Sequence, residues 1–221
     1  KKEKIKIIEG NSYDYSNYIL STSKSKLDKI NKIGFFLDSP APKFKGDGLL
    51  SGQKNIRTEE KWFPSLNKFF DRLEKLLNIK IFIVAHPKVK QEKFPNYFNG
   101  REVLDKSLKE ISKETDLFIT VESTAVSFGV IQKKPIFIIY SDEIKKSEVY
   151  LNNVKFIAKE LGVEAINIDD PFNEKVILSN LKINQEKFAN YKEKYITTLS
   201  TEKPNYKIVG DLILTLTNNA S

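Results

Sequence analysis

Polar side chains that can bind or transfer charge recur immediately after apolar, β-forming runs of this sequence. His86 is the only histidine in the chain and follows the run IKIFIVA. Glu122, Ser123 and Thr124 follow the run LFITV. An imidazole and small hydroxyls can donate hydrogen bonds to phosphate oxygens, and protonation of the imidazole strengthens such a contact. The pattern therefore indicates a site for an anionic ligand at the ends of two strands.

Each of these residues also has an ordinary structural explanation. A histidine at a strand end is often a hydrogen-bonded surface residue. Ser123 or Thr124 can cap the helix that follows, because serine and threonine are common N-cap residues. The two signals support each other, since the carboxyl ends of neighbouring parallel strands face one crevice. We therefore predict a phosphate-binding site made of His86, Pro87, Lys88, Glu122, Ser123 and Thr124.

The segment from residue 40 to residue 55 is rich in proline, glycine and polar residues and is long for a connection, so we expect a binding or closing loop. Asp47 stands between two glycines. It is a candidate catalytic acid or base, although such an Asp-Gly pair more often forms only a turn. The glycine spacing matches neither the dinucleotide-binding loop nor the Walker loop. Lys43 and Lys45 are expected to be solvated.

Other catalytic schemes lack parts in this sequence. There is no G-x-S-x-G nucleophile elbow. One histidine and no cysteine leave only carboxylates as metal ligands. Asp169 and Asp170 follow a short strand, where such a pair is more typical of a cap or turn than of a cation site. The predicted site therefore requires no metal.

The elements that must position these residues alternate between strand and helix patterns, which is typical of an α/β domain with a mostly parallel sheet. We predict strands at residues 32–39, 79–87, 117–123, 135–142 and 163–171. Helices are predicted from Trp62 to Leu77, with Pro64 in the first turn, and over residues 101–114, 124–134 and 150–162. The last fifty residues, 172–221, are expected to be amphipathic helices with a break near Pro204.

Composition narrows the class of partner. The chain of 221 residues has 37 basic and 29 acidic residues, a formal net charge of +8, which favours an anionic partner. Arginine occurs only at 57, 72 and 101, and no stacking pattern for nucleic acid accompanies it, so a phosphorylated small molecule or an acidic glycan is expected instead. No apolar run approaches the ~18 residues of a membrane-spanning helix, so we expect a soluble chain. Because methionine is absent, we expect a processed form or one domain of a longer protein.

One stretch of the chain resembles a known family. The order of a strand ending in AHP, a helix, and DLFITVESTAVSFGVIQKKPIFII resembles the C-terminal, nucleotide-binding domain of GT-B bacterial glycosyltransferases that build surface polysaccharide. Sialyltransferases and Kdo transferases that use CMP-activated sugars carry a His-Pro motif and a Ser-Ser or Ser-Thr motif on successive loops. Here His86-Pro87 and Ser123-Thr124 match them, within a resemblance that covers about residues 32–145.

The resemblance implies a donor site and a larger enzyme. The histidine and the hydroxyls would contact the phosphate of a nucleotide sugar, a CMP-sugar by preference and a UDP-sugar as the alternative, with no further cofactor. The acid/base motif of the family lies in its other domain, and KGDGL around Asp47 echoes it imperfectly. A glycan acceptor and a second Rossmann-like domain would complete the enzyme, and the resemblance places it in the cytoplasm or at the inner face of the membrane.

We therefore predict a Rossmann-like, doubly wound, mostly parallel sheet of about five or six strands, as in one half of a GT-B fold. Residues 32–183 would form the nucleotide-sugar-binding domain, residues 184–221 helices that pack on it, and residues 1–31 a linker or the remnant of a preceding domain. The alternatives are a UDP-sugar epimerase-like protein, a transferase of the CDP-glycerol type, and a non-enzymatic α/β binding module.

Overall fold

Runs of isoleucine, phenylalanine and valine form the four central strands of a sheet. They are β1 (Lys32–Leu37), β2 (Ile79–Val84), β4 (Leu117–Thr120) and β5 (Ile136–Tyr140). Nearly every side chain in them is buried, as expected for parallel strands that helices cover on both faces. This computed structural model describes residues 7–21, 32–43, 56–86, 95–199 and 201–218.

Two short strands complete the sheet, β3 (Val103–Leu104) beside β2 and β6 (Ile166–Asn167) beside β5. The order is β3-β2-β1-β4-β5-β6, and every neighbouring pair is parallel. The predicted Rossmann-like, doubly wound sheet is confirmed. The chain runs outward from β1 through β2 to β3 and then returns to β4 on the other side of β1. Ligands of open α/β sheets bind at such a reversal of strand order, outside the carboxyl ends of the strands.

Helices connect and flank these strands. In the described ranges they are α1 (Tyr13–Ile19), α3 (Glu59–Leu77), α4 (Leu108–Ile111), α5 (Val126–Gln132), α6 (Asp142–Lys145), α7 (Glu148–Leu161), α8 (Glu174–Asn180), α9 (Gln185–Tyr191) and α10 (Asn205–Asn218). A 3₁₀ turn, η2 (Ser112–Glu114), follows α4, and a π-helical turn, η3 (Lys192–Ile196), follows α9. No helix in these ranges is both long and apolar enough to cross a membrane.

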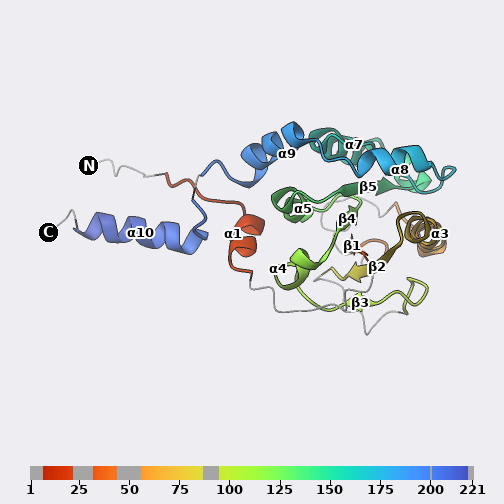
Figure 1. Ribbon diagram of the computed structural model, residues 1–221, viewed down its shortest axis with the longest axis horizontal. Coiled ribbons are helices and arrows are strands. Elements are labelled where there is room, and N and C mark those ends of the chain that lie inside the picture. The colour runs from red at the N-terminus through yellow and green to blue at the C-terminus, as the bar shows by residue number, and fades with distance from the viewer. Residues whose placement is uncertain (1–6, 22–31, 44–55, 87–94, 200, 219–221) are drawn as a thin grey trace.

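The helices lie on both sides of the sheet. Figure 1 shows α3 on one side of the strands and α1, α4 and α5 on the other. α3 buries Trp62, Leu66, Phe70 and Leu73, whose spacing puts them on one face of the helix. α5 lies close to the sheet because Gly129 has no side chain there.

The segment at residues 101–114 differs from the predicted continuous helix. Val103 and Leu104 instead form β3, and Leu104 O accepts a hydrogen bond from Ala85 N–H at 3.4 Å. The helix starts only after Ser107, which forms a capping box with Glu110. The apolar spacing fits a helix locally, but the edge of β2 offers backbone groups that a strand can pair.

α3 begins earlier than predicted. Its first residue is Glu59, so Pro64 lies in the second turn rather than the first. A proline there removes one backbone hydrogen bond of the helix. Burial of the neighbouring Trp62 and Phe63 holds this part of the helix against the sheet.

Candidate functional site

The carboxyl ends of β2, β1 and β4 lie side by side at the reversal of strand order. Asp38 N–H donates to Val84 O at 3.1 Å, so the pairing of β1 with β2 continues past the last residue of β1. β1 pairs with β2 on one side and with β4 on the other. If both pairings are continued to Ser39, this residue lies opposite His86, which follows β2, and opposite Glu122, which follows β4. Three neighbouring strand ends thus present polar residues at one edge of the sheet.

Asp38 and Lys43 form a buried ion pair at this edge. Lys43 Nζ lies 2.5 Å from Asp38 Oδ2, and their side chains are 0% and 1% exposed. The ammonium also lies 5.0 Å from the ring centroid of Phe98. Burial raises the pKa of Asp38, and the charges of Lys43 and Arg57 offset only part of that rise. The expectation that Lys43 is solvated is wrong, because the turn at residues 41–43 folds the lysine back over the strand end.

Arg57 is a second buried cation beside the same strand end. Its Nη1 donates to Ser39 Oγ at 2.9 Å, and its guanidinium lies 4.9 Å from the ring centroid of Trp62. Burial lowers the pKa of Arg57, whereas the charges of Glu122 and Asp38 raise it. The negative charges of Glu122 and Asp38 therefore offset part of the cost of burying the arginine.

The N-terminus of α3 is closed by a carboxylate. Glu143 accepts hydrogen bonds from the N–H and the hydroxyl of Thr58, both at 2.9 Å. A carboxylate in this position matches the positive end of the helix dipole. This helix terminus is therefore occupied by the protein's own anion.

Glu122, Ser123 and Thr124 form the turn between β4 and α5. Ser123 Oγ accepts a hydrogen bond from Ala125 N–H at 3.2 Å, so this hydroxyl stabilises the turn. The interpretation of Ser123 or Thr124 as the helix cap is wrong, because the N-cap of α5 is Ala125 and no side chain caps the helix. Thr124 is exposed, and its carbonyl accepts a bond from Ser127 Oγ at 2.9 Å. Burial raises the pKa of Glu122, and the charge of Arg57 offsets part of the rise.

His86 follows β2 at the same edge and is half-buried. Together with Glu122, Ser123 and Thr124 it flanks the end of β1. The other predicted site residues, Asp47, Pro87 and Lys88, lie outside the described residues.

Asp169, the first residue of the acidic pair after β6, has a structural role. Asp169 Oδ2 accepts from Asp142 N–H at 2.7 Å, and Asn167 Nδ2 donates to Asp142 Oδ1 at 2.8 Å. The interpretation of Asp169 as part of a turn is therefore confirmed. In the ranges that the structure describes, no group of three or more histidine, aspartate or glutamate side chains could hold a metal ion.

Sequence reasoning missed the two buried cations of the site. Lys43 stands in a polar loop and Arg57 precedes a helix, so neither position shows a pattern that distinguishes it from a solvated residue. The scarcity of arginine in a lysine-rich chain was the available signal, because arginine suits buried, planar ion pairing better than lysine does.

No protein-family model matches this chain, and no curated protein sequence matches it. Among solved structures, the chain is similar to one titled "Crystal Structure Analysis of the Glycotransferase of kitacinnamycin", with a TM-score of 0.45 and 11% sequence identity. The similarity covers 87% of this chain and 45% of that one, so the chain spans less than half the length of that structure. The fold of this chain is defined by its strand order and by the register of its strands.

Proposed function

We propose that this chain is the donor-binding domain of a glycosyltransferase, with a CMP-sugar as the favoured donor and a UDP-sugar as the alternative. A glycan of a surface polysaccharide would be the acceptor, and a second Rossmann-like domain would complete the enzyme. The phosphate of the donor would lie over His86, Ser123 and Thr124.

The buried charge at the reversal of strand order carries this proposal. Asp38, Lys43, Arg57 and Glu122 come from three separate segments and meet where open α/β sheets bind ligands. Burying charge is costly, and clustered ionisable groups with shifted pKa values are typical of functional sites. A sheet that needed only stability would place apolar side chains here.

The proposed phosphate contacts suggest how the donor would react. The acceptor oxygen would form a bond to the anomeric carbon while the bond to the nucleotide phosphate breaks, and a base would take the proton of the acceptor hydroxyl. Negative charge on the leaving phosphate would be stabilised by hydrogen bonds from His86 and the hydroxyls of Ser123 and Thr124. Arg57 would hold Ser39 behind them.

Calorimetric titration of the chain with CMP, CDP, UMP and UDP tests the proposal. We expect the tightest binding for a cytidine nucleotide and a loss of about tenfold or more in His86→Ala, because a charge-assisted contact to phosphate is removed. Ser123→Ala should weaken binding as well. Ser179→Ala, on the exposed face of α8, is the matched control and should bind like the unmodified chain.

Two results would contradict the donor site. The first is absence of binding by all four nucleotides. The second is binding that His86→Ala and Ser123→Ala leave unchanged while both variants retain the melting temperature of the unmodified chain.

A non-enzymatic binding module is the second candidate function. It is favoured by α10, which buries no side chain and exposes Ile213 and Leu214 to 55% and 62%. Exposed apolar clusters of this kind are typical of surfaces that contact other macromolecules. Nucleotide binding separates the two candidates, since a module that acts only through α10 needs no nucleotide.

A further inference from the structure

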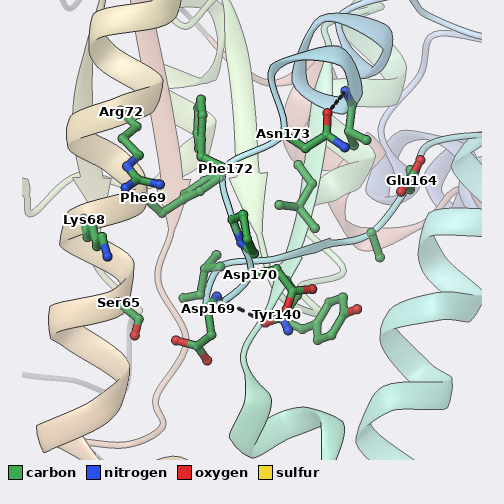
Figure 2. Close-up of a pocket in the computed structure, with 16 residues that line it drawn as sticks. Ser65, Lys68, Phe69, Arg72, Tyr140, Glu164, Asp169, Asp170, Phe172 and Asn173 are labelled. Atoms are coloured by element: carbon green, nitrogen blue, oxygen red, sulfur yellow. Dashed lines mark hydrogen bonds between the residues drawn. The ribbon is translucent and has the colours of Figure 1, made fainter.

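A pocket of about 790 Å³ lies between α3 and residues 164–173. One wall is formed by successive turns of α3, which carry Ser65, Lys68 and Arg72, and the other by the segment around β6, which carries Asp170 and Phe172. Figure 2 shows Arg72 extending from α3 toward Phe172 of that segment. None of His86, Ser123 and Thr124 lines this pocket, so it is separate from the proposed donor site.

The charges on the two walls face one pocket without pairing. Within the described part of the chain, the side chains of Lys68, Arg72, Asp170 and Glu164 form no salt bridge and no side-chain hydrogen bond. The Tyr140 hydroxyl, which also lines the pocket, has no hydrogen-bond partner there either. The pocket thus offers donors on one wall and acceptors on the other to a ligand.

Packing holds the two walls in place. The rings of Phe69 and Phe172 lie 5.9 Å apart, centroid to centroid, and join α3 to the opposite segment. The guanidinium of Arg72 lies 5.9 Å from the same Phe172 ring. Asp169 anchors the loop to α6 through its bond with Asp142 N–H. The two walls that carry the charges are therefore held in place by the fold.

We propose that this pocket binds an acidic saccharide. Its carboxylate would pair with Arg72 and Lys68, because a guanidinium binds carboxylates with two parallel hydrogen bonds. Its hydroxyls would donate to Asp170 and Glu164, which accept only. The rings of Phe69 and Phe172 would contact the C–H face of a sugar ring, and the volume lies within the ~300–1,000 Å³ of ordinary ligand pockets. This inference rests on the proposed function and assigns the glycan acceptor to an acidic class.

The test is calorimetric titration of the chain with trigalacturonic acid, with maltotriose as the neutral probe of similar size. We expect binding of trigalacturonic acid that falls at least tenfold in the double variant Lys68→Gln/Arg72→Gln, since the partners of the carboxylate are lost. Lys75→Gln removes a positive charge from an exposed position of α3 outside the pocket and should bind like the unmodified chain. Equal weakening by Lys75→Gln would overturn the site and leave only general attraction by the net charge of +8.

The Asp170→Ala variant tests the proposal by the direction in which the affinity for trigalacturonic acid changes. If Asp170 accepts sugar hydroxyls, this variant weakens the binding of trigalacturonic acid even though it makes the chain more positive. Tighter binding in Asp170→Ala, or equal binding of maltotriose and trigalacturonic acid, would overturn the proposal. Titration of the same variants with CMP keeps the two proposals apart, because the pocket variants should leave nucleotide binding unchanged whether or not the saccharide binds.

Discussion

Individual residues at the end of β1 combine burial with charge. Lys43 and Asp38 exclude water from their ion pair, and Arg57 adds a cation that Glu122 compensates. A buried pair of this kind contributes little net stability, but the loss of one partner leaves an uncompensated charge in the interior. The cluster therefore makes the stability of the chain sensitive to single substitutions.

Lys43→Met should lower the free energy of unfolding by about 3–5 kcal/mol near neutral pH, because Asp38 is left buried without its partner. The deficit should shrink as the pH falls, since the pKa of Asp38 is raised and protonation removes the buried charge. Urea denaturation followed by fluorescence of Trp62, the single tryptophan, measures the effect. The double variant Lys43→Met/Asp38→Asn should be more stable than Lys43→Met alone, and additive losses would contradict the account.

Glu122 should make nucleotide binding depend on pH. Its folded pKa is raised by burial, so acidification through that pKa neutralises a carboxylate that would repel phosphate. CMP should therefore bind more tightly as the pH falls. Glu122→Gln should bind about threefold to tenfold more tightly near neutral pH, with a flatter pH profile. Protonation of the CMP phosphate changes the affinity of the unmodified chain and of Glu122→Gln alike. Parallel plots of affinity against pH for these two proteins would therefore show that Glu122 does not face the ligand.

At the scale of elements, α5 must lie close to the sheet for the turn at Ser123 to lie at the end of β4. A Cβ atom at Gly129 would lie 2.8 Å from two side-chain carbons of the buried Ile136 and 3.0 Å from Phe118. The helix therefore has no space for a larger residue at this position, and only glycine allows the observed approach.

Gly129→Ala should destabilise the chain by about 1–3 kcal/mol, because overpacking outweighs the better helix propensity of alanine. Gly210→Ala in α10 is the matched control, since no atom lies within 4 Å of a Cβ there. It should be neutral or slightly stabilising. Thermal unfolding of both variants measures these effects. A Gly129→Ala variant as stable as the unmodified chain would mean that α5 can move away from the sheet.

At the scale of the whole molecule, segments from the two ends of the chain are held together. Thr197 Oγ1 donates to Asn11 Oδ1 at 2.5 Å, and Asn11 Nδ2 donates to Lys203 O at 2.9 Å. Asn205 completes the contact with bonds to the backbone of Asn11 in both directions. Figure 1 shows α10 extending away from the domain. The position of α10 therefore depends on a few polar contacts rather than on a buried apolar face.

Asn11→Ala should lower the free energy of unfolding by about 1–3 kcal/mol, because Thr197 Oγ1 and the Lys203 carbonyl each lose a hydrogen bond. Asn153→Ala, at an exposed position of α7, should have no such cost. Chemical denaturation measures the stability, and hydrogen exchange of the α10 amides reports whether the helix is released. Equal stability of the two variants would show that these bonds do not hold the ends together.

The fold class and most elements could be predicted from the sequence, because apolar runs of isoleucine and phenylalanine alternate with helical spacing such as that of Trp62 to Leu73. His86 and Ser123 were recognisable as strand-end residues for the same reason. Only the tertiary structure decided that β1 lies between β2 and β4, that Val103 and Leu104 form a strand, and that Lys43 and Arg57 are buried beside Asp38. Local periodicity records which face of an element is apolar, whereas strand order and buried charge depend on contacts between residues far apart in the chain.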